Sequence, residues 1–445
     1  MKKKLIILGG GESGVGAALL GKKKGYEVLL FDESSLKDGY RNELKKAGIN
    51  FLEKNISDEV LLSADEVVKS PGIPEKNEKV QKIRSKGIPL ISEIELAYRY
   101  KGNSTIIAIT GSNGKSTTTS LIYHICKLAG LNAALVGNIG YSFAKQVAED
   151  PKPVYVAEIS SFQLDDIKDF RPDVAILLNI TEDHLDRYDY KFENYIQSKF
   201  LITKNQTSND VFIYNIDDEV ITAYLKQNQN QSNQLPISMK KEMEKGAFIK
   251  NDEMKVLEGN EQMSMSVYDF ALKGKHNQYN TMAACVAGAT MDIRKDKIRE
   301  AVQTFESLEH RMETVAMVRG VEFINDSKAT NVNSTWFALE SINKPTVLIL
   351  GGVDKGNDYS FIMEMVKEKV KAIVCLGVDN KNIHAAFGDH VKLVDTTSAP
   401  EAVSAAFQLA TVGDAVLLSP ACASFDLFKN YEDRGTQFKN AVRDL

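Results

Sequence analysis

A glycine-rich segment, residues 111–117, carries the residue types of a phosphate-binding loop. It follows the apolar run 106–109, precedes a helical pattern and reads Gly-Ser-Asn-Gly-Lys-Ser-Thr. In such a strand–loop–helix unit, backbone N–H groups and the helix N-terminus face a phosphate, the lysine reaches the terminal phosphates and a hydroxyl binds Mg²⁺. The widespread form of this loop has one more glycine, where this chain has Ile109. The sequence therefore predicts a nucleotide site of a shorter type, with a helix-capping turn and a surface Lys115 as the alternative.

Three further side chains could complete this site. Glu158 ends an apolar strand, where a carboxylate beside a phosphate loop can hold Mg²⁺. His184 lies in the polar run 181–187 after the next apolar strand, and Lys199 lies on an amphipathic helix that follows. Taken singly, a capping glutamate, a structural histidine and a surface lysine are the plainer interpretations. Beside Lys115, they favour a metal–nucleotide site.

A second glycine pattern follows the first expected strand. Gly9, Gly11 and Gly14 have the spacing of a dinucleotide-binding turn, and Asp32 ends the next strand. On its own this pattern indicates an NAD-dependent oxidoreductase, and it also fits a mononucleotide diphosphate. The Pro/Gly turn at 70–74 follows a later strand, where open parallel sheets bind ligands. A plain tight turn is the alternative.

The last part of the chain has polar loops after three apolar runs, at 325–331, 354–356 and 419–426. Such loops at strand ends predict a binding site. Upstream, Asn277 and Asn280 are three residues apart and share one helical face. Their amides could bind an adenine edge, although a helix N-cap is the alternative.

Alternating strand and helix patterns predict an α/β fold with three domains. The chain has 445 residues, which is more than one ordinary core holds. We expect domains at 1–97, 98–306 and 307–445. Residues 226–270 have weak periodicity and are interpreted as an irregular or edge-strand insertion without an assigned function. The pattern at 316–324 predicts a hairpin.

Composition disfavours several function classes. The net charge is −5 and basic residues are scattered, so we expect no nucleic-acid partner. No apolar run has the length of a membrane span, and the basic start reads as a first strand rather than a signal peptide. The cysteines are far apart without CxxC spacing, which suits a reducing cytoplasm and disfavours a structural zinc site. They are Cys126, Cys285, Cys375 and Cys422.

In combination, these motifs resemble those of the Mur ligase family of peptidoglycan synthesis over essentially the whole chain. The segments that carry the resemblance are TGSNGKSTT, EISSFQL, LNITEDHLDRY, GKHNQYN, EHRME, NDSKATN, GGVDKGND and SPACASFDLFKNYEDRG. The family has the short phosphate loop, so Ile109 fits it. The resemblance implies a Rossmann-like N-terminal domain that binds UDP rather than NAD, a central P-loop-type ATPase domain, and a Rossmann-like C-terminal domain that contacts D-glutamate and ATP.

Carried over residue by residue, the resemblance implies four sets of contacts. The ATP site would comprise Gly111, Ser112, Asn113, Gly114, Lys115, Ser116, Thr117, Asn277, Asn280, Arg311 and Asp326. The UDP-sugar side would comprise Ser13, Asp32, Ser70, Pro71, Gly72 and Asn138. D-Glutamate would meet Lys328, Thr330, Lys355, Ser424 and Tyr431. Two Mg²⁺ ions would be held by Ser116, Glu158, His184 and Lys199, the last as a carbamate. Lys115, His184 and Lys199 would be the catalytic residues.

The resemblance is closest to the members that add D-glutamate to UDP-N-acetylmuramoyl-L-alanine (UDP-MurNAc-L-Ala). It implies a cytoplasmic, monomeric ligase that forms an acyl phosphate with ATP. An L-alanine-adding ligase or a folylpolyglutamate synthase is the nearest alternative. An oxidoreductase would leave Lys115, Glu158 and His184 without a role, and a nucleotide-dependent switch or motor would explain only the phosphate loop.

Overall fold

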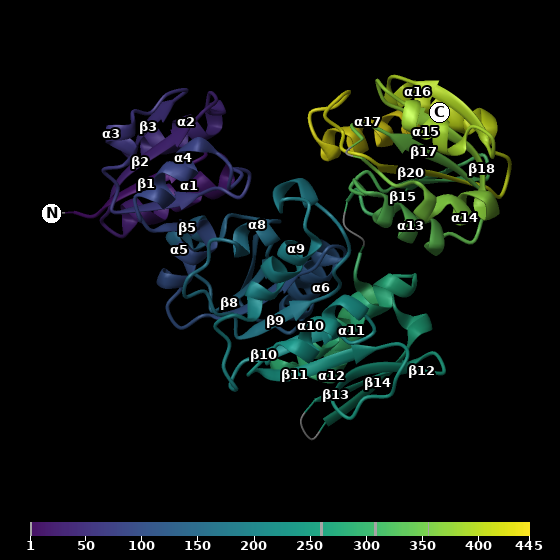
Figure 1. The fold of residues 1–445 in the computed structure, drawn as a ribbon. Coiled ribbons are helices and arrows are strands. Elements are labelled where there is room, and N and C mark those ends of the chain that lie inside the picture. The colour runs from purple at the N-terminus through teal and green to yellow at the C-terminus, as the bar shows by residue number, and fades with distance from the viewer. Residues whose placement is uncertain (1, 259–260, 307–308, 355) are drawn as a thin grey trace. The chain divides into compact units, whose positions relative to one another are not determined.

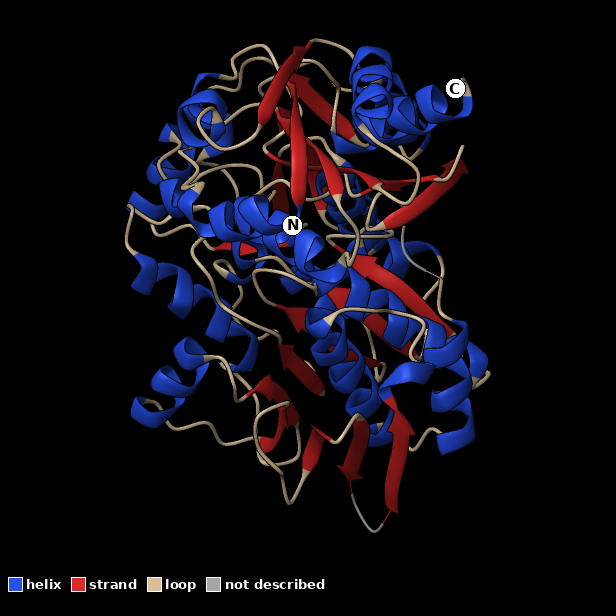
Figure 2. Cartoon of the chain, turned by 90° about the vertical axis from the view of Figure 1, so that its right-hand side faces the viewer, coloured by secondary structure: helices blue, strands red, loops and turns tan. Residues whose placement is uncertain are grey.

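The computed structural model describes residues 2–258, 261–306, 309–354 and 356–445. The chain forms two compact units, the first made of Met1–Ala271 with Gln278–Phe305 and the second of Leu272–Asn277 with Glu306–Leu445. The first unit contains two sheets and the second contains one, each flanked by helices (Figures 1 and 2). The predicted α/β fold with three domains is confirmed.

The N-terminal sheet is parallel throughout, with strand order β3-β2-β1-β4-β5. The central strand β1 is almost fully buried, as its continuous apolar run requires in a sheet covered on both faces. The strands are β1 (Lys4–Leu8), β2 (Glu27–Asp32), β3 (Asn50–Glu53), β4 (Glu66–Lys69) and β5 (Leu90–Ser92). The helices are α1 (Glu12–Lys23), α2 (Asp38–Lys46), α3 (Asp58–Leu61), α4 (Glu78–Ser85) and α5 (Glu93–Tyr100).

Helix α5 leads from this sheet into the next and runs through the expected boundary at residues 97 and 98. Glu95 on α5 is completely buried, and one carboxylate oxygen accepts N–H bonds from Lys168, Asp169 and Phe170 at 2.8–2.9 Å. Charge-assisted bonds of this kind are stronger than neutral ones. They fasten α5 to a loop of the second sheet, so the two sheets of the first unit are connected by more than the chain itself.

The second sheet has the order β14-β13-β12-β11-β10-β9-β6-β8-β7. Its strands are β6 (Thr105–Thr110), β7 (Ala133–Gly137), β8 (Val154–Glu158), β9 (Val174–Leu177), β10 (Val211–Asn215), β11 (Asn233–Ser238), β12 (Gly246–Lys250), β13 (Glu253–Glu258) and β14 (Glu261–Ser266). Its α-helices are α6 (Lys115–Leu128), α7 (Phe143–Glu149), α8 (Ser161–Leu164), α9 (Phe192–Phe200), α10 (Glu219–Gln227), α11 (Lys275–Thr290) and α12 (Lys295–Thr304). Strand β6 pairs in parallel with β8 on one side and β9 on the other, so the side to which the chain adds strands switches beside the phosphate loop.

The insertion expected at 226–270 contributes the regular edge strands β11–β14. Met254 and Val256 on β13 pair with Met265 and Met263 on β14, and all four side chains are buried. Methionine alternates here with polar residues. Methionine indicates a strand only weakly, but the alternation has the two-residue period of a strand. This explains why the sequence indicated an edge but did not define its strands.

The third sheet has the order β15-β16-β20-β17-β18-β19. Its strands are β15 (Glu313–Val318), β16 (Val321–Asn325), β17 (Thr346–Gly351), β18 (Val370–Leu376), β19 (Lys392–Thr396) and β20 (Ala415–Ala421). Helices α13 (Val332–Ser341), α14 (Ser360–Lys369) and α15 (Lys381–Phe387) pack on one face, and α16 (Ala399–Leu409) and α17 (Tyr431–Arg443) pack on the other. The antiparallel pair β15–β16 confirms the predicted hairpin.

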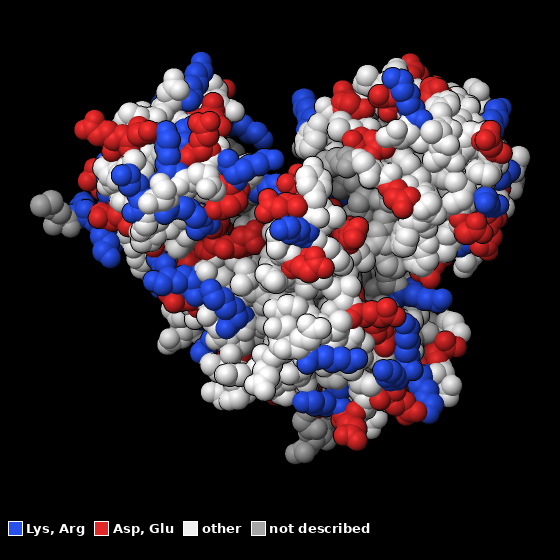
Figure 3. Space-filling model, in the orientation of Figure 1, with Lys and Arg blue, Asp and Glu red and all other residues white. Residues whose placement is uncertain are grey.

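The surface of each unit carries charges of both signs. On the face shown in Figure 3, acidic and basic side chains are interspersed. Within the described part of the chain, no helix combines the length and the apolar character needed to cross a membrane.

We predict that Gly14→Ala destabilises the first unit. An added Cβ at this position on α1 would lie 1.8 Å from the carbonyl oxygen of Gly9, so strand β1 and α1 would have to separate. Overpacking of this kind costs about 1–3 kcal/mol, which urea unfolding should measure. Gly11→Ala is the matched control, because its Cβ would meet nothing within 4 Å. Equal stability of the two variants would contradict the close packing.

Candidate functional site

The phosphate loop joins β6 to α6 and depends on two glycines with left-handed backbone. Gly111 has φ of +149° and Gly114, the N-cap of α6, has φ of +83°. A Cβ on Gly114 would lie 2.4 Å from Oδ1 of Asn280, which reaches the loop from α11. The loop is therefore a backbone surface with no room for side chains at this point, as close approach to a phosphate requires.

Lys115 begins α6 and folds back over the loop. Its Nζ donates to the carbonyl oxygens of Gly111 and Ser112 at 2.8 and 2.7 Å. Ser116 and Thr117 are buried in the first turn of the helix. The predicted ATP-site residues of this segment thus lie together, with a cation and a helix N-terminus at one place.

Glu158 ends β8 next to this loop and is almost completely buried. Its Oε1 accepts a bond of 2.7 Å from the amide of Asn138, while Oε2 has no hydrogen-bond partner among the described residues. A buried carboxylate oxygen without a partner costs free energy unless a cation meets it. Asn138, expected on the UDP-sugar side, therefore contacts the expected metal ligand.

Lys199 on α9 lies beneath the same loop and is fully buried. Its Nζ donates to the carbonyl oxygen of Gly111 at 2.7 Å and lies 3.4 Å from Oγ1 of Thr110. Burial, reinforced by the nearby Lys115 ammonium, holds the pKa of Lys199 well below its ordinary value. The interpretation of Lys199 as a surface residue is wrong, because the side chain is buried and its amine donates to the backbone of the loop.

His184 lies in the loop after β9 and has a left-handed backbone with φ of +53°. Its ring packs edge-on against Phe162 with centroids 5.1 Å apart, and its Nε2 lies 3.6 Å from the carboxylate of Asp183. A non-glycine residue in this conformation is strained, and such strain concentrates at functional sites. The exposed imidazole is thus held in a defined direction by aromatic packing.

The N-terminal sheet places most of the other predicted UDP-side residues at the ends of β1, β2 and β4. Asp32 accepts the N–H groups of Gly10 and Ser34 at 2.6 and 2.7 Å, so it shapes the glycine turn. Ser13 lies in the first turn of α1, and Ser70, Pro71 and Gly72 follow β4. The Pro71 carbonyl accepts a bond of 3.1 Å from Arg187, whose guanidinium stacks on Phe162.

The second unit gathers the residues expected to meet D-glutamate at the ends of its strands. The Lys328 ammonium lies 5.5 Å from the ring centroid of Tyr431, and Ser424 is buried in the loop after β20. Thr330 is exposed, and Lys355 lies outside the described residues. Arg311 and Asp326, expected at the ATP site, are also in this unit.

Asp326 directly follows β16, near the start of the polar stretch, and accepts bonds from the Ser419 hydroxyl at 2.9 Å and the Met312 N–H at 3.2 Å. Burial raises its pKa to about 7, although the Arg311 guanidinium opposes the shift. Asn277 and Asn280 both lie on α11, which begins at Lys275. The Asn277 amide donates to the Lys273 carbonyl at 2.8 Å, whereas Asn280 meets the phosphate loop.

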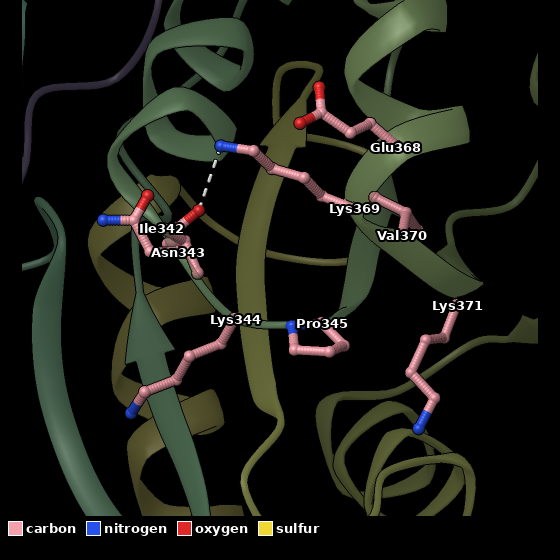
Figure 4. A pocket seen from close by; sticks show the side chains of 8 residues that line it. All are labelled: Ile342, Asn343, Lys344, Pro345, Glu368, Lys369, Val370 and Lys371. Carbon is pink, nitrogen blue, oxygen red and sulfur yellow. Dashed lines mark hydrogen bonds between the residues drawn. The ribbon is translucent and has the colours of Figure 1, made fainter.

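A separate pocket of about 410 Å³ lies at the amino ends of β17 and β18 (Figure 4). Lys369 on its wall donates to carbonyls at the end of α13, including that of Ile342 at 3.0 Å. Lys344 and Lys371 pair with Glu322 and Asp414. These lysines pair at the end of the sheet opposite the polar loops that follow its strands.

Family models match three consecutive parts of the chain. The Mur ligase MurD-like N-terminal domain matches residues 3–92, the Mur ligase middle domain matches 109–288, and the Mur ligase glutamate ligase domain matches 310–422. The chain belongs to the Mur ligase family. Membership of this family accounts for the presence of both the short phosphate loop and the N-terminal glycine turn in one chain.

Curated relatives of this Mur ligase are similar over their whole length. Proteins named UDP-N-acetylmuramoylalanine–D-glutamate ligase from Christiangramia forsetii, Bacteroides fragilis and Cytophaga hutchinsonii are 53%, 52% and 50% identical to it, with complete coverage of both chains. Among solved structures, a UDP-N-acetylmuramate–alanine ligase from Thermotoga maritima aligns over both full chains with a TM-score of 0.64 at 18% identity. A pseudomurein peptide ligase from Methanothermus fervidus gives 0.63 at 19%. At these identities the structures support the fold alone.

The donors around the loop of this Mur ligase fit a hard divalent cation. The hydroxyl of Ser116 and the unpartnered Oε2 of Glu158 are oxygen ligands of the kind Mg²⁺ prefers. Both are buried beside a loop that presents backbone N–H groups to a phosphate. The predicted magnesium-binding chemistry is therefore compatible with this donor set.

Sequence reasoning missed Arg434 on α17, which is 1% exposed. Its guanidinium donates to the Ser327 hydroxyl and carbonyl at 3.0 and 2.8 Å, to the Cys422 carbonyl at 3.2 Å and to the Gly351 carbonyl at 3.4 Å. Burial lowers its pKa to about 10. The three loops that follow β16, β17 and β20 thus meet at one side chain. Its position in the segment NYEDRG was the only sequence signal.

We predict that Arg434→Met lowers the free energy of unfolding of the second unit. The carbonyl groups of Ser327 and Cys422 would lose buried donors, at about 1–3 kcal/mol for each group left unsatisfied. Trp336 on α13 is the only tryptophan of the chain, so its fluorescence during urea unfolding reports this unit. Arg443→Met, an exposed site on the same helix, is the control. Coincident unfolding curves for the two variants would contradict this role.

Proposed function

We propose that this Mur ligase joins D-glutamate to the L-alanyl carboxyl group of UDP-MurNAc-L-Ala, with ATP converted to ADP and phosphate. The observation that carries the reaction type is the convergence of Lys115, Lys199 and the unpartnered Glu158 carboxylate oxygen on one glycine loop. The names of full-length relatives at 48–53% identity support the choice of substrates. A Thermotoga maritima ligase with the same fold, at a TM-score of 0.61, was solved in complex with ADP.

The chemistry explains why the site needs these groups. A carboxylate does not react with an amine, so its oxygen first attacks the γ-phosphorus of ATP to give an acyl phosphate and ADP. The amine of D-glutamate then attacks the acyl carbon, and the tetrahedral intermediate expels phosphate. Lys115 and the loop N–H groups offset the repulsion between the two anions and the charge of the transferring phosphoryl group. Mg²⁺, held by Ser116 and Glu158, would supply further neutralisation when bound.

Each substrate is assigned to a set of loops. UDP is placed at the glycine turn and the Ser70–Gly72 segment of domain 1–97, and ATP at the loop of domain 98–306, with Asn280 beside the loop. Domain 307–445 would hold D-glutamate through Lys328, Thr330, Ser424 and the backbone of Tyr431, with Lys355 as a further contact. Arg311 and Asp326 would complete the nucleotide site from the same domain. His184 is assigned to orient the metal or its waters.

The decisive assay follows phosphate release from ATP. We expect release that requires both UDP-MurNAc-L-Ala and D-glutamate, because the acyl phosphate needs the first substrate and its consumption needs the second. Release with UDP-MurNAc and L-alanine instead would identify the L-alanine-adding reaction, and release with neither would favour a nucleotide-dependent switch. A change in NADH absorbance without phosphate release would support the oxidoreductase.

Lys199 is proposed to carry a carbamate. Its neutral amine would attack CO₂, forming an N–C bond and releasing one proton, and the resulting carboxylate would help to place a second Mg²⁺. Full burial and the lowered pKa of Lys199 support this assignment, because only the neutral amine is nucleophilic. The bond from Nζ to the Gly111 carbonyl directs the amine toward the phosphate loop.

We predict that Lys199→Ala abolishes ligase activity and that a small added carboxylate restores part of it. Carbon-13 NMR of protein equilibrated with labelled bicarbonate should show a carbamate signal that the variant lacks. Lys204→Ala, an exposed lysine just beyond α9, is the control and should keep both the activity and the signal. Full activity of Lys199→Ala would refute the assignment.

The compartment and assembly state are also proposals. All four cysteines are free and buried, which supports a reducing cytoplasm. We propose that the enzyme acts there as a monomer.

A further inference from the structure

Three potential metal ligands meet at the edge of the third sheet, outside the proposed substrate loops. Cys375 on β18 and Asp395 on β19 are register partners of adjacent parallel strands, so their side chains leave the same face of the sheet. Helix α15 joins these two strands and carries His384. One donor atom from each residue lies within 4.8 Å of the other two.

The geometry of this cluster is organised by hydrogen bonds. Both carboxylate oxygens of Asp395 lie 3.0 Å from Nε2 of His384, and Oδ1 also accepts a bond of 2.9 Å from the Asn380 amide. The Cys375 thiol is fully buried under α15, where Ile383 packs in the same core cluster. One ligand is therefore fixed by the core and a second is oriented by a neighbouring amide, as metal ligands commonly are.

Solvent reaches the cluster from one side. His384 and Asp395 are about half exposed and line a pocket of about 520 Å³. The carboxylates of Asp379 and Glu401 line the same pocket, together with the Lys381 ammonium, which lies 4.0 Å from the Asp379 carboxylate. A cation can thus reach the His384 and Asp395 donors from this pocket, and the buried Cys375 thiol, which does not line it, would complete the site from the core side.

We propose that Cys375, His384 and Asp395 bind one divalent transition-metal ion, with Zn²⁺ as the preferred ion and water as the fourth ligand. Thiolate, imidazole and carboxylate are the three side-chain ligands of zinc, and three protein ligands plus water form an open tetrahedral site. Binding forms the metal–sulfur bond and releases the thiol proton to solvent, so no redox partner is needed. Mg²⁺ would not compete well, because it prefers oxygen donors.

This site differs from the zinc motif that the sequence disfavoured. That expectation rested on the absence of CxxC spacing, which is typical of structural sites with paired cysteines. Here a single cysteine is joined by residues nine and twenty positions later, brought together by a strand–helix–strand crossover. The crossover also suggests the consequence of binding, since the ion would tie edge strand β19 and α15 to β18.

The test is a titration of the full-length, tag-free protein with Co²⁺ alone, which reports sulfur ligation by a thiolate-to-metal absorption band. We expect a band that saturates at one equivalent and that Zn²⁺ removes by displacement. His384→Gln should weaken Co²⁺ binding by about tenfold or more, and Cys375→Ser should remove the band. His390→Gln, an exposed histidine between α15 and β19, is the matched control.

A second readout does not depend on absorption. Trp336 fluorescence reports the unfolding midpoint of the second unit. Zn²⁺ should raise this midpoint in the wild type, and it should raise the midpoint of His384→Gln much less. His384→Gln changes a half-exposed side chain, so it should fold even if Cys375→Ser does not. Absence of the band, its persistence in Cys375→Ser, or equal affinity of His384→Gln and the wild type would each overturn the proposal. Because the site needs no nucleotide, these outcomes are independent of the ligase assay.

Discussion

The burial of the Lys199 amine beneath the phosphate loop is the constraint around which the first unit is arranged. A charged amine without water costs several kcal/mol unless partners surround it or it gives up its proton. Here the Gly111 carbonyl accepts its bond, and the Lys115 ammonium lies close enough to lower its pKa further. The Gly111 carbonyl thus accepts from both lysines, and it links the start of α6 and the end of α9 to the backbone of the loop.

A hydrogen bond in the first unit connects the residues expected to bind the UDP-sugar substrate with those expected to bind the metal. The amide of Asn138 donates to one oxygen of Glu158, and the other oxygen has no hydrogen-bond partner in the part of the chain that the structure describes. If Asn138 contacts the UDP-sugar substrate, as the family resemblance implies, then the same amide orients the expected metal ligand. Acceptor recognition and phosphoryl transfer would share a hydrogen bond rather than act through separate parts of the enzyme.

Much of the fold was predictable because its strands are short apolar runs that end in glycine or polar loops. The phosphate loop, Glu158 and the hairpin at 316–324 followed from local patterns. Arg434, the approach of Asn280 to Gly114, and the meeting of Cys375 with His384 and Asp395 were not accessible in this way, because each depends on which strands become neighbours. Asp32 illustrates the difference: its place after β2 was predicted, but its bonds to the glycine turn required the folded backbone.

Arg434 holds the loops of the second unit largely through their carbonyl groups, contacting Gly351 and Cys422 only by backbone atoms. Backbone carbonyls are common to every amino acid, so Arg434 does not constrain the side chains at positions 351 and 422. Other bonds within these loops do involve side chains, among them those of Asp354 and Asn357. The contacts that fix the loop backbones are therefore partly separable from the side chains that the loops expose. Substitution of side chains that make no such bonds could therefore change the surface that these loops expose without loss of their contacts to the Arg434 guanidinium.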